Sequence, residues 1–150
     1  MKRALRVGKL TLAALESVLK VYLDPATAFE KVPTLRMIAT KKEAVADRAR
    51  RFGRRLSDLP VRISTISSVS RVGGGSLPLE ELPTMLLAFE TEEISANELE
   101  GRLRLQDPPV VARIVEDKLC LDLRTVMPRE LGDLERAIRC ALQDTETRKK

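Results

Sequence analysis

The chain contains no histidine and no tryptophan, and its only cysteines are Cys120 and Cys140. Without an imidazole, a Ser-His triad and most zinc sites are excluded, and we expect no metal site. The two thiols could form a disulfide, but two buried free thiols are the better interpretation for the cytoplasmic chain that we expect.

Aromatic residues and long apolar runs are also scarce. Aromatic content of 3% argues against a protein that stacks single-stranded bases on its side chains. No apolar run reaches the roughly 18 residues of a membrane span, so we expect no membrane partner. The basic start, Met1 to Arg3, is followed by Arg6, Lys9 and Glu16, which is not the pattern of a signal peptide.

What the chain does contain is typical of one folded domain. Its 150 residues are 43% hydrophobic and 33% charged, which suits a globular protein with a core. The net charge of +5 is compatible with a nucleic acid or another anionic partner. A solvated basic surface would give the same charge, so basicity alone decides nothing.

The first half of the chain predicts two long helices and one strand. The first helix covers about residues 9–23, with one stripe of Leu12, Leu15, Leu19 and Tyr22 and a second of smaller apolar residues. Two stripes suggest that this helix is covered on both sides. Asp24-Pro25 should end it, and a loop and a short turn should follow.

The second helix covers about residues 41–57. Thr40 and Glu43 form its predicted capping box, and its apolar stripe is Val45, Ala49, Phe52 and Leu56. A strand is expected over residues 61–70 because β-branched residues alternate there with serine and threonine.

The second half predicts strands at 85–89, 110–115 and 119–123. It also predicts two helices, one that carries Leu99 and a final one that carries Ile138. Pro78 and Pro83 should keep the chain before residue 85 irregular. The last two strands read as an antiparallel hairpin with one buried face. The fold class is therefore α+β, an antiparallel sheet of about four strands with helices packed on it.

Arg3 and Arg6 are the first candidate site residues. Two guanidinium groups three residues apart could hold a phosphate-like oxyanion, or they could form an ordinary exposed basic terminus.

Gly73, Gly74, Gly75 and Ser76 form the second candidate, a possible site-adjacent loop. It lacks the Lys-Ser/Thr ending of a P-loop, so a close-packed turn near a site or interface is the better interpretation. Asp122 and Arg124 read most simply as outward-facing strand residues, and no constellation makes a self-contained active site.

Several segments together resemble one family, and they occur in that family's order over nearly the whole chain. The family is bacterial L-seryl-tRNA(Sec) selenium transferase, or selenocysteine synthase, and the resemblance is to its C-terminal region. The segments are Lys2–Val7, Lys9–Glu16, Val21–Leu23, Pro33–Met37, Val72–Pro78, Glu81–Pro83 and Leu121–Val126.

The resemblance implies the small domain of a pyridoxal 5'-phosphate enzyme of fold type I. Such enzymes convert seryl-tRNA(Sec) to selenocysteinyl-tRNA(Sec) with selenophosphate as donor, and they form homo-oligomers. Arg3 and Arg6 match the arginine pair that binds the donor or its oxyanion analogues. The cofactor lysine lies upstream of the matching segment, so this chain lacks it, and Lys9 is not that residue. Gly8 departs from the aspartate usual in the family.

The resemblance also implies a domain organisation. Residues 1–40 would form a connecting helix and turn that pack on an absent cofactor domain, residues 41–145 the small domain, and residues 146–150 a charged tail. We expect such a C-terminal fragment to be inactive alone. Three alternatives stay open: a free-standing basic RNA-binding module built on the helix at 41–55, the small domain of another fold-type-I enzyme, and a remnant without function.

Overall fold

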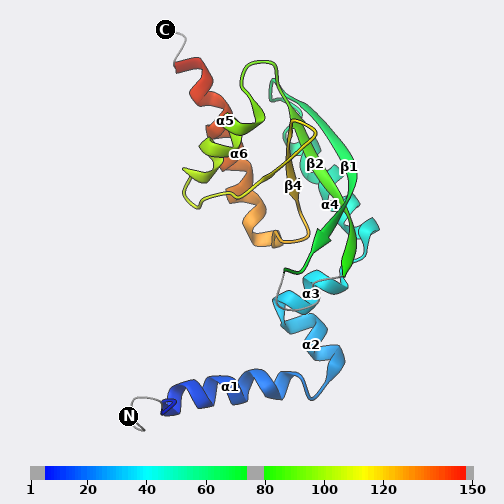
Figure 1. Ribbon diagram of the computed structural model, residues 1–150, viewed down its shortest axis with the longest axis vertical. Coiled ribbons are helices and arrows are strands. Elements are labelled where there is room, and N and C mark those ends of the chain that lie inside the picture. Colours follow the sequence, from blue (N-terminus) through cyan, green and yellow to red (C-terminus); the bar gives the residue numbers. More distant parts are fainter. Residues whose placement is uncertain (1–5, 74–79, 148–150) are drawn as a thin grey trace. The chain divides into compact units, whose positions relative to one another are not determined.

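The computed structural model describes residues 6–73 and 80–147, and the chain divides into two compact units, Met1–Ala39 and Thr40–Lys150 (Figure 1). The first unit holds the helices α1 (Lys9–Val21), α2 (Pro25–Lys31) and α3 (Pro33–Ala39). The elements of the second are α4 (Lys42–Arg55), β1 (Arg62–Arg71), β2 (Glu81–Glu90), α5 (Ala96–Arg104), β3 (Arg113–Val115), β4 (Lys118–Asp122), the 3-10 turn η1 (Pro128–Glu130) and α6 (Leu131–Thr147).

The first unit is more helical than the sequence predicts. Helix α1 ends at Val21, and Asp24 caps α2, because its carboxylate accepts hydrogen bonds from the Ala26 amide (3.1 Å) and the Thr27 hydroxyl. Pro25 occupies the first helical position, where its missing N–H costs nothing. The expected loop after residue 24 is therefore wrong: Asp-Pro is a helix-start signal here.

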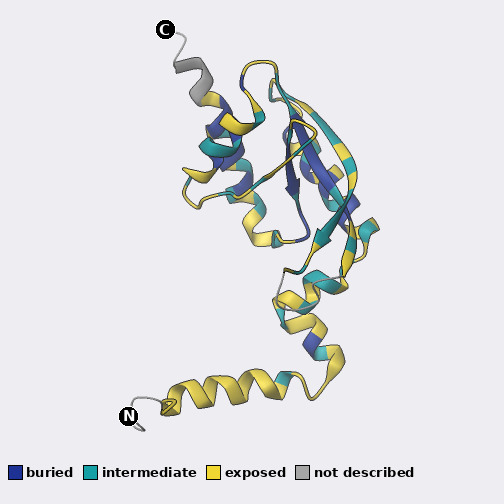
Figure 2. Cartoon of the chain, viewed as in Figure 1, coloured by how far each residue is buried: buried dark blue, intermediate teal, exposed yellow. Residues whose placement is uncertain are grey.

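Helix α1 has no buried residue (Figure 2). Its predicted stripe lies on the surface, with Leu12, Leu15 and Leu19 each more than half exposed. In the described chain neither stripe is covered, so packing of this helix against further protein stays a prediction. No described helix is long and apolar enough to cross a membrane.

The second unit confirms the predicted α+β class. Its four strands pair antiparallel in the order β1-β2-β4-β3 (Figure 1). The β3–β4 hairpin turns at Glu116 and Asp117, both of which have positive φ angles. Lys118, which lies between the two predicted strands, belongs to β4 and pairs with Val115, and β3 begins three residues later than predicted.

One continuous core joins three helices to one face of this sheet. The stripe of α4 is fully buried as predicted, and helices α5 and α6 add their apolar faces. The sheet contributes alternate residues of β2 and β4, which is the periodicity of a strand with one face on a core. The main members from these elements are Phe52, Leu56, Leu87, Phe89, Leu99, Leu103, Leu119, Leu121, Leu123 and Ile138.

The opposite face of β2 and β4 is also buried, which corrects the expectation of a hairpin with one buried face. Leu86, Ala88 and Cys120 have no exposed surface and form a second small core. The sheet curls strongly, as the bent β1–β2 ribbon in Figure 1 shows. As a result Arg113 in β3 donates a 3.1 Å hydrogen bond to the Val69 carbonyl in β1, the strand at the other edge.

Two further local predictions are wrong. Lys41, not Thr40, is the N-cap residue of α4, and its own side chain makes no capping hydrogen bond. Pro83 lies inside β2 rather than in an irregular segment. The Pro83 nitrogen faces away from β1, and the pairing of β2 with β4 begins only at Leu86. The missing N–H of Pro83 therefore costs no ladder hydrogen bond.

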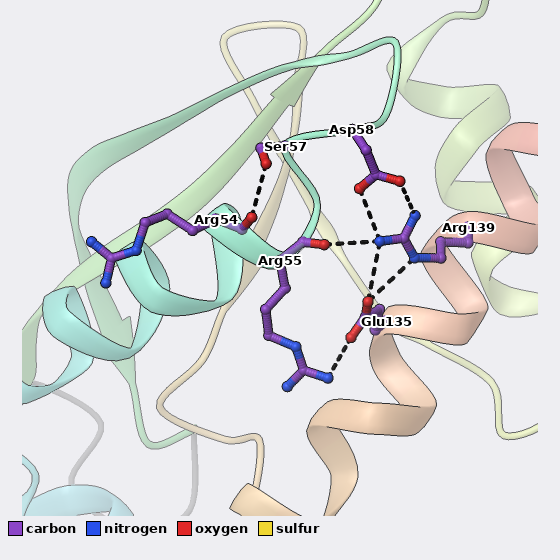
Figure 3. Close-up of polar contacts among 6 residues, drawn as sticks. All are labelled: Arg54, Arg55, Ser57, Asp58, Glu135 and Arg139. Atoms are coloured by element: carbon purple, nitrogen blue, oxygen red, sulfur yellow. Dashed lines mark hydrogen bonds and ion pairs between the residues drawn. The ribbon is translucent and has the colours of Figure 1, made fainter.

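A polar cluster ties the end of α4 to α6 (Figure 3). Arg139 holds Asp58 with two hydrogen bonds of 2.6 and 2.9 Å and donates to the Arg55 carbonyl at 2.8 Å. Glu135, one turn earlier in α6, accepts from Arg139 and pairs with Arg55. The Arg139 hydrogen bond lowers the pKa of the exposed Asp58 carboxyl.

Candidate functional site at the end of the sheet

The end of the sheet where β1 passes into β2 contains a carboxylate that joins four parts of the fold. Asp122, at the end of β4, accepts hydrogen bonds from the Thr84 hydroxyl and the Arg124 amide, both at 3.0 Å. The Ser70 hydroxyl of β1 also donates to it, and Arg113 of β3 lies 3.5 Å away. The carboxylate is largely buried, with 14% of the side chain exposed, so these donors replace its lost hydration.

Arg124 is the second polar centre of this junction and is only 4% exposed. Its guanidinium donates to the Thr40 carbonyl at 2.5 Å and to the Pro83 carbonyl at 2.6 Å. It therefore joins the segment before α4 to β2. Burial lowers the pKa of Arg124, and the nearby Asp122 charge raises it in part.

The two residues are therefore not outward-facing strand residues, as their alternation with leucines suggests. The Leu121–Val126 segment leaves the strand after Asp122, and the turn carries Arg124 back into the domain. Arg48 of α4 holds this turn through the carbonyls of Leu123 (2.8 Å) and Val126 (3.1 Å). The alternation of apolar and polar residues does not show where a strand ends. The sequence analysis therefore did not predict the junction.

The glycine loop begins at the same end of the sheet. Gly73 has a φ angle of +102°, which an L side chain rarely adopts. Gly74, Gly75 and Ser76 lie outside the described residues. On either side of the loop, Arg71 and Glu81 form a 2.7 Å ion pair between β1 and β2.

A cavity of about 570 Å³ opens beside the junction. Ser70, Arg113, Asp122 and Thr125 contribute polar groups to its wall, and the Pro108–Val111 segment contributes apolar surface. Two further carboxylates, of Glu130 and Asp133, line it beside Leu134 at the start of α6. The arrangement can hold a small molecule or a chain segment. The described carboxylates in its wall all have partners: Asp122 pairs with Arg113, Glu130 accepts from the Met127 amide, and Asp133 pairs with Arg136.

The cysteines do not supply a nucleophile to this cavity. Burial raises the pKa of the Cys120 thiol, which keeps it protonated and unreactive. Cys140 is exposed, which corrects the expectation of two buried thiols, and both cysteines are free. Within residues 6–73 and 80–147, no three histidine, cysteine or acidic side chains are grouped so that they could hold a metal ion.

The predicted oxyanion pair is not part of this junction. Arg3 lies outside the described residues. Arg6 is exposed and lies two residues before the N-cap of α1, in the other unit of the chain. The role of Arg3 and Arg6 in binding an oxyanion therefore stays a prediction.

Fold and site together define a small α+β domain with a buried carboxylate–guanidinium junction. Two of the segments that carry the family resemblance, 81–83 and 121–126, meet there through the hydrogen bond from Arg124 to the Pro83 carbonyl. A family model described as L-seryl-tRNA selenium transferase matches residues 1–127. The chain belongs to this family.

Curated relatives agree with that assignment. Three of them are called L-seryl-tRNA(Sec) selenium transferase, and each match covers more than nine-tenths of this chain. The relative from Aquifex aeolicus is 42% identical over 137 residues, covering 91% of this chain and 30% of the relative. The relative from Geobacter sulfurreducens is 45% identical over 140 residues, covering 91% of this chain and 30% of the relative. The relative from Nitratidesulfovibrio vulgaris is 44% identical over 145 residues, covering 95% of this chain and 31% of the relative.

The chain thus spans about 30% of the length of the curated relatives that it matches. Their names describe an enzyme that acts on seryl-tRNA(Sec), and that activity belongs to a protein about three times as long.

Proposed function

We propose that this chain is the small C-terminal domain of an enzyme that converts L-seryl-tRNA(Sec) to L-selenocysteinyl-tRNA(Sec) with selenophosphate. The observation that carries the proposal is the family match over residues 1–127. In this role the domain acts in the cytoplasm as part of a homo-oligomer.

The described residues do not fit pyridoxal phosphate by themselves. The cofactor's Schiff base requires a lysine set in a site, and every described lysine is exposed or already engaged. Lys42 donates to the Ser67 hydroxyl at 2.7 Å, and Lys118 pairs with Glu90 at 3.1 Å. We therefore propose that the cofactor is bound by the part of the relatives' length that this chain does not span, and that the chain is inactive alone.

Within the complete enzyme, we propose that Arg3 and Arg6 bind the selenium donor. Their guanidinium groups are permanently charged forks that match the oxygens of a phosphate-like anion. The Gly73–Ser76 loop is proposed to lie next to the substrate, where a backbone without side chains allows close approach.

The test replaces the corresponding region of the Geobacter sulfurreducens enzyme with this chain and measures selenocysteinyl-tRNA formation. We expect the hybrid to be active and the 150-residue chain alone to give no product. Arg3→Ala and Arg6→Ala should each raise KM for selenophosphate about tenfold or more in the hybrid, because one charge-assisted contact is lost.

Lys9→Ala is the matched control, since it removes a nearby positive charge and should leave that KM unchanged. A hybrid that folds and binds cofactor but does not form product would contradict the assignment of the domain. Equal KM values for the arginine variants and the control would contradict the donor-binding role alone.

The RNA-binding alternative is not supported by the geometry of α4. Half of its basic residues are engaged with the domain itself. Arg48 binds the carbonyls of Leu123 and Val126, Lys42 binds Ser67, and Arg55 pairs with Glu135. We propose no second function on that basis.

A further inference from the structure

A groove of about 530 Å³ runs between α4 and strand β1. Its floor is apolar and includes Ile63 and Leu87. Gly53 of α4 lies directly above these two residues, since a Cβ atom there would be 3.2 Å from Leu87 Cδ1 and 3.4 Å from Ile63 Cγ2. The remaining lining residues are Ala49, Arg50, Arg54, Ser57, Val61, Ser64 and Thr65.

Strand β1 forms the other wall of the groove and is the outermost strand of the sheet. Val115 and Lys118 flank the two-residue β3–β4 turn and so form a hydrogen-bonded pair. When the antiparallel alternation is followed from this pair through β4 and β2, the main-chain groups of Val69 point away from β2. Since main-chain groups alternate along a strand, those of Ile63, Thr65 and Ser67 point to the same outer edge. Within residues 6–73 and 80–147 these groups have no backbone partner.

The sequence of β1 does not protect this edge. Edge strands usually carry internal charges, proline or a bulge that prevents another strand from pairing with them. Between Arg62 and Arg71 the strand contains only serine, threonine, isoleucine and valine, and its pairing with β2 is continuous over ten residues. Such an edge can accept a further extended segment.

The positive charge of the groove favours an acidic segment. Arg50 and Arg54 are its only charged lining residues, and they lie one helical turn apart on α4. Arg54 has no ion-pair or side-chain hydrogen-bond partner in the described chain, and the Arg50–Asp47 pair is more than half exposed on both sides. An acidic ligand could therefore pair with both arginines at little cost.

We propose that the β1–α4 groove binds an extended acidic segment of a partner protein by β-strand addition. Main-chain hydrogen bonds to Thr65 and its outward neighbours hold the segment. Alternate apolar side chains of the segment enter the groove, and its carboxylates pair with Arg50 and Arg54. The proposal does not depend on the proposed selenium-transferase role.

A direct test uses the 150-residue chain and a short fluorescein-labelled peptide of alternating valine and glutamate. Binding is followed by fluorescence anisotropy, and the contact site by amide chemical shifts of the ¹⁵N-labelled chain. We expect saturable binding, with the largest shifts at Ile63, Thr65 and Ser67. The matched peptide in which lysine replaces every glutamate should not bind.

Two pairs of variants separate strand addition from charge attraction. Arg54→Glu should weaken binding about tenfold or more, whereas Arg51→Glu should change it less than about twofold. Arg51 is the control because it is exposed on the same helix but does not line the groove. Thr65→Pro removes an outward N–H without breaking the β1–β2 ladder and should abolish binding, while Thr65→Ala should not.

Circular dichroism checks the fold of each variant. If Thr65→Pro does not fold, the chemical-shift map of the unaltered chain still tests whether the peptide binds at the outer edge of β1. Shifts confined to other surfaces, or equal binding of the lysine peptide, would overturn the proposal. So would displacement of the peptide by an RNA oligonucleotide with the same shift pattern, or a second copy of the chain paired at β1.

Discussion

At the scale of single residues, Asp122 and Arg124 are the groups on which several elements depend. They lie two residues apart, yet their side chains reach β1, β2 and the segment before α4. A buried carboxylate is stabilised only while its donors remain in place, and the same donors would be left unpaired without it. The junction therefore acts as a unit.

We predict that Asp122→Asn lowers the free energy of unfolding by about 2–4 kcal/mol, because it removes a partly buried charge from four donors. Asp47→Asn is the control. It makes the same chemical change in an exposed pair with Arg50, and should cost less than about 1 kcal/mol. Urea unfolding followed by circular dichroism measures both, and equal losses would show that the junction adds nothing to stability.

At the scale of elements, the contact of α4 with the sheet depends on a residue without a side chain. Gly53 lies over Leu87 and Ile63, and a Cβ atom there would be 3.2 Å from Leu87 Cδ1, so the Leu87 side chain would have to shift to admit it. The apolar stripe of α4 was predicted from its spacing, but the place where the helix comes closest to the sheet was not. Spacing shows which face is buried and not how close the neighbouring element lies.

Gly53→Val should lower the free energy of unfolding by about 1–3 kcal/mol, because the added atoms overpack this contact. Gly101→Val is the matched control in α5, where a Cβ atom would have open space. It should change stability by no more than about 0.5 kcal/mol, since valine is a slightly better helix former than glycine. Thermal and urea unfolding of the two variants would contradict the close contact if both were neutral.

At the scale of the whole molecule, the two units differ in how much core they contain. All buried hydrophobic residues in the described chain lie between Val45 and Leu142, except Ala28 in α2. The three helices of the first unit bury little surface, and helices of 13 or 7 residues are marginal without tertiary packing. We propose that the second unit carries the stability of the chain.

A shortened chain of residues 40–150 should therefore keep its fold, with cooperative unfolding and a Tm within about 5 °C of the full chain, equivalent to about 1 kcal/mol. Differential scanning calorimetry measures the transition, and amide spectra compare the two folds. Loss of cooperative unfolding in the shortened chain would show that the first unit stabilises the second.

The α+β class, the buried stripes of α4 and α5, the β3–β4 hairpin and the family resemblance could be read from the sequence alone. They follow from local periodicity and ordered motifs, which are properties of neighbouring residues. The buried junction of Asp122 and Arg124, the place of Pro83 within a strand and the second core around Cys120 became visible in the folded domain alone. Each depends on how the sheet curls and where β4 ends, and both result from packing between segments that are far apart in the sequence.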